Sequence, residues 1–408
     1  MLPELLAPAG NMAALKAALH FGADAVYGGM KAYGLRAFAG NFGEEELREA
    51  VYLCHAAGKK FYLTLNIFPF EDQLEGFVDA ARTAQAIGVD AAIVSDLGAI
   101  VTLREQVPGL PLHVSTQAST VNAAAVRHYQ ALGCSRVILA REVSIERMRL
   151  IAEHAPDMEL ETFVHGAACM AYSGRCLLSA AMAGRSGNQG TCAQPCRWQY
   201  AVMEQKRPGE YLPVSEDEHG TYIFSAKDLN LMPLLPDLVS AGVASLKIEG
   251  RMKTEYYVAT VTGAYRRALD LLATGESAFR AALPSLMDEL TCASHRDSDT
   301  GFALSSPTEP GGAEGFHQSR EYVALAVEDA EPGESARFQL KNRFHAGDAL
   351  ELMTATGILP VTASPFLREK TGETLDTLGI AGEMIRMPMP CMVRAGDILR
   401  GPVRNHRI

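Results

Sequence analysis

The chain has 408 residues, of which 48% are hydrophobic and 21% are charged, and its formal net charge is −11 at pH 7. This length predicts a large domain and a smaller one. The acidic balance excludes a protein covered by a polyanion-binding surface, so any nucleic-acid contact would be a local basic patch. The sequence has no secretory signal and no run of about 20 apolar residues, so we expect a cytoplasmic protein without a membrane partner.

Short apolar runs alternate with amphipathic stretches over the first 250 residues. The runs predict eight strands: Glu4–Ala7, Ala25–Gly28, Lys60–Asn66, Ala91–Ser95, Leu112–Thr116, Arg136–Ala140, Leu160–Val164 and Ser245–Glu249. The stretches between them have helical periodicity, as in Asn11–Phe21, Glu44–Ala57, Gln73–Ile87, Asn122–Leu132 and Ile145–His154. Eight such units predict a (β/α)8 TIM-like barrel over residues 1–274. A doubly wound sheet is the alternative, but Ala7–Asn11 matches its G-x-G-x-x-G phosphate loop poorly.

The carboxyl ends of barrel strands are where active sites lie. Polar residues follow the predicted strands at these ends: Tyr27, Asn66, Asp96, Ser115–Gln117, Arg141, Glu142, His165 and 247–251. We take His165, Lys247, Glu249 and Arg251 as the candidate catalytic residues, because several polar groups converge on one rim. The alternative is structural: the last three would form ion pairs that stabilise the barrel, and His165 would bond a loop carbonyl.

Four cysteines lie within 28 residues directly after the seventh strand, with the spacing C-x6-C-x15-C-x3-C: Cys169, Cys176, Cys192 and Cys196. They predict an insertion at about residues 166–200 that caps the barrel mouth. Four thiols without a histidine suit a structural zinc ion or an iron–sulfur cluster. The irregular spacing favours iron–sulfur, since zinc sites usually present two short pairs. Four buried, unligated cysteines are the third alternative.

Beyond residue 250 the pattern changes. Thr254–Ala273 predicts a helix with Arg266 and Arg267 on its exposed side, and residues 275–320 predict a helical and linker segment. Residues 321–408 predict a small all-β domain, a β-barrel with the strands Glu321–Val327, Ala336–Leu340, Asp348–Thr354 and Met384–Pro388. A lid, a dimerisation module and an RNA-guiding platform would all give this pattern.

Several motifs resemble one known family. Glu161-x-Phe163-x-x-Gly166-x-x-Cys169 followed by 172–179 (YSGRCLLS) is similar to the signature of the collagenase-like peptidase family U32. The segments 5–11 (LLAPAGN), 23–29 (ADAVYGG), 36–42 (RAFAGNF) and 245–253 (SLKIEGRMK) fit the same family. The resemblance covers about residues 1–270, and the C-terminal domain resembles the accessory domain of longer members.

Within this family the chain most resembles the prephenate-dependent tRNA hydroxylases, which convert wobble uridine to 5-hydroxyuridine without molecular oxygen. The resemblance implies tRNA and prephenate as partners and a 4Fe–4S cluster on Cys169, Cys176, Cys192 and Cys196. The Cys192–Cys196 spacing separates the chain from the quinone-hydroxylase branch. An rRNA hydroxylase and a collagenase-like peptidase remain alternatives, although the sequence has neither H-E-x-x-H nor G-x-S-x-G.

The implied chemistry suggests roles for the rim residues. Prephenate is a dicarboxylate, so we expect Arg36, Lys247 and Arg251 to bind its carboxylates. A flipped uridine needs hydrogen-bond partners and a stacking face, for which Tyr27, Asn66 and Gln117 are the candidates. The basic residues expected to follow the tRNA backbone are Arg175, Arg185, Arg197, Lys253, Arg266 and Arg267. A solvated face paired with nearby carboxylates is the alternative for these arginines.

Overall fold

The computed structural model describes residues 2–31, 33, 40–169, 171–198, 201–202, 212–213, 227–304 and 316–404. The chain divides into two units. The first comprises Met1–Met12, Asp24–Lys253 and Arg296–Gly315, and the second comprises Ala13–Ala23, Thr254–His295 and Phe316–Ile408. Arg36, predicted to bind a carboxylate, lies outside the described residues.

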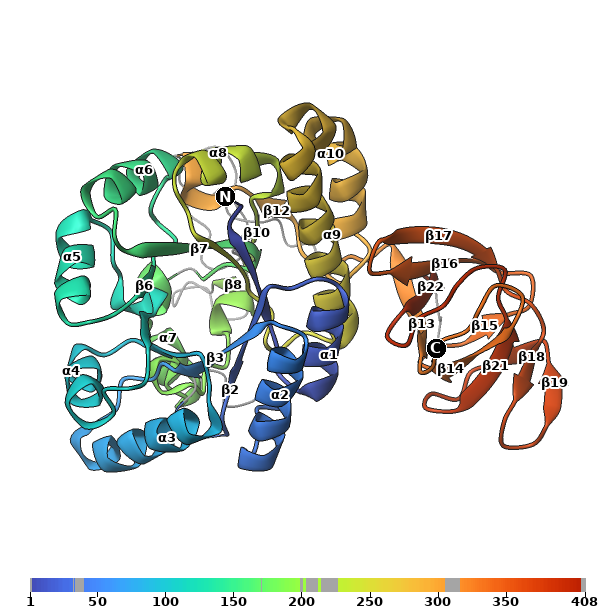
Figure 1. The fold of residues 1–408 in the computed structure, drawn as a ribbon, viewed down its shortest axis with the longest axis horizontal. Helices are drawn as coiled ribbons and strands as arrows, with labels where there is room; N and C mark the ends of the chain where they lie inside the picture. The colour runs from blue at the N-terminus through green and yellow to red at the C-terminus, as the bar shows by residue number, and fades with distance from the viewer. Residues whose placement is uncertain are drawn as a thin grey trace. The chain divides into compact units, whose positions relative to one another are not determined.

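Eight parallel strands close into a barrel in the first unit (Figure 1). They are β1 (Glu4–Pro8), β2 (Ala25–Gly29), β3 (Lys60–Leu65), β4 (Ala91–Val94), β5 (Leu112–Val114), β6 (Arg136–Ile138), β7 (Glu159–Ala167) and β11 (Ser245–Ile248). Neighbours in this order pair with each other, and β11 pairs with both β1 and β7. This double pairing closes the ring, so the predicted TIM-like fold is confirmed.

A helix follows each barrel strand along the chain. These helices are α1 (Met12–His20), α2 (Glu44–Ala56), α3 (Leu74–Ile87), α4 (Leu97–Gln106), α5 (Ala123–Ala131), α6 (Ile145–His154), α8 (Leu235–Ser240) and α9 (Glu255–Thr274). Asp96, Asn122 and Ser144 cap α4, α5 and α6 by accepting a hydrogen bond from a first-turn backbone N–H. In the described ranges, no helix is both long and apolar enough to cross a membrane.

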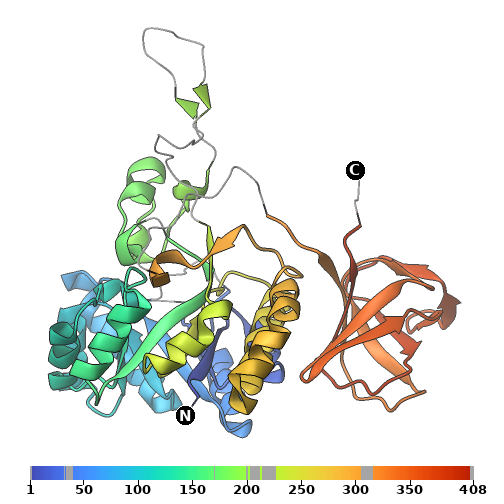
Figure 2. The same cartoon turned by 90° about the horizontal axis from the view of Figure 1, so that it is seen from above.

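Strand β7 extends past its barrel neighbours and carries further structure. Its last residues pair with the antiparallel strand β10 (Asp228–Asn230), which in turn pairs with β12 (Ser298–Asp299). The cysteine segment follows β7 and contains the helix α7 (Leu178–Ala183), which projects beyond one end of the barrel in Figure 2. The segment therefore starts at the carboxyl end of a barrel strand.

Large apolar and aromatic side chains from the barrel strands pack into one buried cluster. Its members are Leu6, Ala25, Tyr27, Tyr62, Ala91, Ile93, Ile138 and Phe163. Packed side chains fill a barrel of eight strands, so it is a solid core and not a pore. This core positions the site, because four of its members also line the cavity described below.

The second unit contains the predicted β domain. Its eight-stranded antiparallel sheet has the order β17-β16-β22-β13-β14-β21-β18-β19. The strands in chain order are β13 (Arg320–Ala326), β14 (Ser335–Leu340), β16 (Ala349–Thr354), β17 (Gly357–Thr362), β18 (Phe366–Arg368), β19 (Glu373–Leu375), β21 (Met384–Pro388) and β22 (Ile398–Pro402). A two-stranded pair, β15 (Phe344–His345) with β20 (Thr377–Leu378), accompanies it. The helix α10 (Glu276–Leu290) and α9 belong to the same unit.

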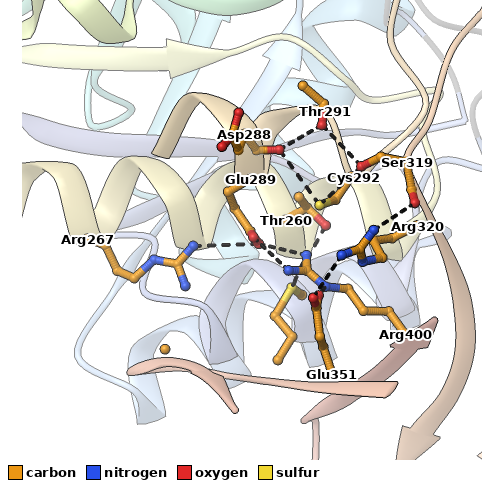
Figure 3. A network of polar contacts seen from close by, with 12 residues as sticks. Thr260, Arg267, Asp288, Glu289, Thr291, Cys292, Ser319, Arg320, Glu351 and Arg400 are labelled. Atoms are coloured by element: carbon orange, nitrogen blue, oxygen red, sulfur yellow. Dashed lines mark hydrogen bonds and ion pairs between the residues drawn. The ribbon is translucent and has the colours of Figure 1, made fainter. Parts of the chain in front are cut away.

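A buried ion-pair network joins the helices and the sheet of the second unit (Figure 3). Arg400 on β22 donates two hydrogen bonds of 2.8 and 2.7 Å to Glu289 on α10, and a third of 2.7 Å to Glu351 on β16. Arg267 on α9 lies 3.5 Å from the same Glu289. The prediction that Arg266 and Arg267 are exposed is therefore wrong. Both side chains are about one-fifth exposed and paired with a carboxylate, Asp270 in the case of Arg266.

Candidate active site

A cavity of about 290 Å³ lies at the carboxyl ends of the barrel strands. Core side chains of the barrel, including Tyr27, Ile93 and Phe163, form part of its lining. Residues that follow the strands form another part, and the cysteine segment supplies the rest. The cavity therefore lies between the barrel core and the segment that follows β7.

Most of the predicted site residues share this cavity. It is lined by Tyr27, Asn66, Gln117, Lys247, Glu249, Arg251, Cys169, Cys176, Cys192 and Cys196. His165 is buried and is not among the lining residues; its backbone joins β7 to β10 and β11. The prediction that the cysteine segment and the strand ends meet at one mouth thus agrees with the geometry.

Polar contacts hold the cysteine segment against the strand ends. Glu142, which follows β6, accepts hydrogen bonds of 2.7 and 2.8 Å from the backbone N–H and hydroxyl of Ser173. The Arg175 guanidinium donates to the carbonyl of Gln117 at 2.7 Å, and Arg185 donates to that of Thr191 at 2.8 Å. Two arginines predicted to follow RNA phosphates therefore order the segment itself. The side chain of Arg197 lies outside the described part of the structure.

The four cysteines of the segment all line the cavity. No disulfide joins any of the chain's eight cysteines, all of which are described. Cys176 and Cys192 each accept a backbone N–H at 3.3 Å, from Leu178 and Gln194. Among the described residues, no three His, Cys, Asp or Glu side chains are close enough to hold a single metal ion. Four thiols without a histidine are a donor set that suits an iron–sulfur cluster or a structural zinc ion.

A buried ion pair lies beneath the cavity. Lys247 Nζ donates to Glu161 Oε1 at 2.8 Å, and both residues are almost fully buried. Burial lowers the pKa of the Lys247 ammonium, and the negative charge of Glu161 opposes this effect. Burial raises the pKa of Glu161, but Lys247 and Arg136 outweigh it and leave that pKa below its ordinary value. The ammonium also lies 4.3 Å from the centroid of the Tyr27 ring.

Three other lining side chains are fixed by hydrogen bonds. The Tyr27 hydroxyl donates to the carbonyl of Ile248 at 2.8 Å. Arg251 Nη1 donates to the Thr64 hydroxyl at 2.7 Å. Gln117 accepts a bond from the Ser95 hydroxyl at 3.3 Å through Oε1, which leaves Nε2 as its donor for a bound molecule. The positions of these polar groups are therefore set before any ligand binds.

His113 lies on β5 against Tyr62, with 4.7 Å between the ring centroids. Burial lowers the pKa of His113 to about 3, and the positive charge of Arg136 adds to the effect. Histidine in an unfolded chain has a pKa of about 6.5. Between these two values the unfolded chain binds more protons than the folded one, so folding stability falls as the pH is lowered below about 6.5.

We expect a His113→Phe variant to lose less stability than the wild type between pH 6.5 and 4.5. The free energy of unfolding should fall with decreasing pH less steeply in the variant than in the wild type. The difference between the two slopes should approach about 1.4 kcal/mol per pH unit, which is the effect of one bound proton. Denaturant unfolding at several pH values measures it. His128→Phe, which replaces an exposed histidine on α5, is the control and should follow the wild-type curve. Parallel curves for wild type and His113→Phe would contradict the buried neutral imidazole.

Sequence reasoning missed three groups that define the site. Thr64 anchors Arg251, and Ser173 binds Glu142. Glu161 appeared only as part of a motif, although it compensates the buried Lys247. The available signal was a charged residue in the middle of an apolar strand, since such a residue needs a buried partner.

Comparison with known proteins identifies the family. The model of peptidase family U32 matches residues 10–311, and that of the U32 C-terminal domain matches residues 318–400. The tRNA hydroxylation protein P of Escherichia coli is 38% identical, over 95% of this chain and 94% of its own length. The tRNA hydroxylation protein P1 of Bacillus subtilis is 39% identical, over 86% and 83%. The 23S rRNA 5-hydroxycytidine C2501 synthase of E. coli is 38% identical, over 66% of this chain and 39% of its own length. The chain therefore belongs to peptidase family U32 and carries that family's C-terminal domain.

Proposed function

We propose that this protein hydroxylates uridine in tRNA, converting the wobble base to 5-hydroxyuridine without molecular oxygen. The observation that carries the proposal is the composition of the cavity, whose lining includes four cysteines together with cations and amides. The similarity to tRNA hydroxylation proteins extends over both units. The match to the rRNA-modifying relative covers only 39% of that protein, which favours tRNA over rRNA as the substrate.

The peptidase alternative has less support from the same geometry. A cysteine protease requires a thiolate next to a histidine. Cys169 lines the cavity, whereas His165, four residues earlier, is buried outside the lining. A Cys–His pair at this site would also leave the other three lining cysteines without a role.

Cys169, Cys176, Cys192 and Cys196 are the proposed ligands of a 4Fe–4S cluster, which would supply one-electron redox chemistry. The side chains of the cavity would bind the base and the co-substrate. Gln117 and Asn66 would bond the edge of a flipped uracil, with Tyr27 as the stacking face. Lys247 and Arg251 would attract the carboxylates of prephenate, the proposed co-substrate. Enclosure of the base between the barrel and the cysteine segment would exclude water.

Anaerobic reconstitution tests the function. Purified protein is incubated with unmodified tRNA, with and without prephenate, and the nucleosides are analysed by mass spectrometry. We expect 5-hydroxyuridine only in tRNA and only with prephenate. In cells, deletion of the gene should remove the modification from tRNA, and the wild-type gene should restore it. Gelatin cleavage by a protein whose lining cysteines are replaced would support the peptidase instead.

Gly29 gives a precise way to displace Arg251. A Cβ added there would lie 2.6 Å from Arg251 Nη1 and 3.0 Å from the Thr64 hydroxyl, so the guanidinium would have to move. We expect Gly29→Ala to raise the prephenate concentration needed for half-maximal activity at least tenfold, since a charged hydrogen bond contributes about 1.5–3 kcal/mol. Iron content should be unchanged. Gly357→Ala is the matched control, because an added Cβ there meets nothing within 4 Å; an unaltered Gly29→Ala enzyme would exclude a role for Arg251.

A further inference from the structure

Arg141 lines the cavity but, unlike Lys247, it forms no ion pair with a described carboxylate. It follows β6 and lines the cavity, yet no aspartate or glutamate among the described residues forms an ion pair with it. Its Nε is buried and has no hydrogen-bond partner there. Lys247, by contrast, is compensated by Glu161 at 2.8 Å. A partly buried charge without a counterion is costly, so this guanidinium is suited to an anion that enters the cavity.

The nearest acid in the sequence forms no ion pair with Arg141 in the described part of the structure. Glu142 is adjacent to Arg141, but both of its carboxylate oxygens accept hydrogen bonds from Ser173. The chain thus uses this carboxylate to hold the cysteine segment in place. The positive charge of Arg141 is left for a ligand.

Two contacts fix the orientation of the Arg141 guanidinium. Its guanidinium lies 4.2 Å from the centroid of the Phe163 ring, which restrains its plane. Nη1 donates to the carbonyl of Ala167 at 3.3 Å. Nε is buried, so Nη2 is the guanidinium nitrogen that remains for a bound molecule, and a charged N–H donor binds a carboxylate oxygen strongly.

We propose that the guanidinium of Arg141 binds one carboxylate of the organic-acid co-substrate. This inference rests on the proposed function, because it takes prephenate as the co-substrate. It assigns the main anchoring contact to a residue that follows β6, with Lys247 and Arg251 as further cations in the lining of the cavity. Arg141 would therefore determine the affinity for the acid and not the state of the cysteines.

Binding of prephenate to the anaerobically purified, iron-loaded protein tests the proposal by calorimetry, without RNA. We expect Arg141→Gln and Arg141→Ala to weaken binding at least tenfold, and Arg141→Lys to restore only part of it, because lysine lacks the planar guanidinium that lies over the Phe163 ring. In the hydroxylation assay, KM for prephenate should rise with a much smaller change in kcat. Iron content and circular dichroism should match the wild type. Arg149→Ala, an exposed residue on α6, is the control and should bind normally.

The outcomes separate the two levels of the proposal. If the wild type binds prephenate and Arg141→Gln binds it equally well, the role of Arg141 is wrong while the proposed function stands. If the wild type binds no prephenate, the co-substrate assignment fails and the Arg141 contact fails with it. A loss of iron in Arg141→Gln and Arg141→Lys alike would show that Arg141 holds the cavity wall and does not anchor the acid.

Discussion

A Cys176→Ala variant should lose both its iron and its hydroxylase activity, whereas a Cys54→Ala variant should keep both. Cys176 lines the cavity and already accepts a backbone N–H from Leu178. The thiolate is the form of cysteine that binds metal. Cys54 is buried in α2, and burial raises the pKa of its thiol to about 12, so it stays protonated at neutral pH. We expect activity to fall at least about 100-fold in Cys176→Ala.

Anaerobic purification followed by iron and sulfide analysis measures this difference. Wild type and Cys54→Ala should be brown, with a broad absorbance toward the blue end of the visible range, and Cys176→Ala should be colourless. Cys134→Ala is a second control, since burial raises the pKa of that thiol to about 11. Metal ligation should also order the segment, so amide exchange over residues 166–196 should be faster in Cys176→Ala. Stoichiometric zinc without sulfide in the wild type would overturn the cluster.

Hydrophobic periodicity was sufficient to predict the strands of the barrel, but it predicted only part of the strands of the β domain. Each barrel strand is buried on both faces, which gives the continuous apolar runs that the sequence displays. In the β domain, β13, β14, β16 and β21 were predicted, but β22 and the two-residue strands β15 and β20 were not, and neither were β17, β18 and β19. The last two have three residues each, and β17 contains Pro360 and exposes much of its length. Short or exposed strands lack the alternation from which a strand can be inferred.

Two similar segments of the β domain form turns whose conformation follows from their local sequence. The segments 344–348 (FHAGD) and 393–397 (VRAGD) form equivalent turns in front of β16 and β22. In each, the aspartate accepts a hydrogen bond from the backbone N–H three residues earlier, at 2.6 and 2.8 Å. Gly347 and Gly396 have φ values of 89° and 102°, which favour glycine. A local rule fixes these turns, so the sequence is enough to predict them.

The site was predictable where its residues are neighbours in sequence and not where they meet across the fold. The cysteines and the polar residues after the strands follow from local spacing. The partner of Lys247 does not, because Glu161 is 86 residues away and the two come together only when β11 pairs with β7. Both faces of a barrel strand are buried, so periodicity cannot say which side chains point inward. For the same reason Arg141 was recognised as a polar residue on the rim but received no role.

A Glu161→Gln variant should suffer the largest loss of stability of any single substitution in the barrel interior discussed above. Glu161 is fully buried and lies 2.8 Å from Lys247 Nζ and 3.1 Å from Arg136 Nη1. Its removal leaves the buried Lys247 ammonium without its ion-pair partner, which costs about 3–5 kcal/mol. Arg136 is less affected, since it keeps Glu4 at 2.6 Å and Glu159 at 2.7 Å.

Three further variants isolate the cause of this loss. Glu159→Gln removes another carboxylate from the same Arg136, but the Glu159 side chain is 55% exposed, so the cost should not exceed about 1 kcal/mol. Lys247→Met alone leaves Glu161 paired with Arg136 at 3.1 Å and should cost less than Glu161→Gln. The double variant Glu161→Gln with Lys247→Met should recover stability relative to Glu161→Gln, because the uncompensated charge is gone. Urea unfolding of the four proteins and the wild type gives the coupling energy. If Glu161→Gln were no less stable than Glu159→Gln, Lys247 would not be held as a buried ammonium. Lys247 could then not attract a carboxylate through a positive charge.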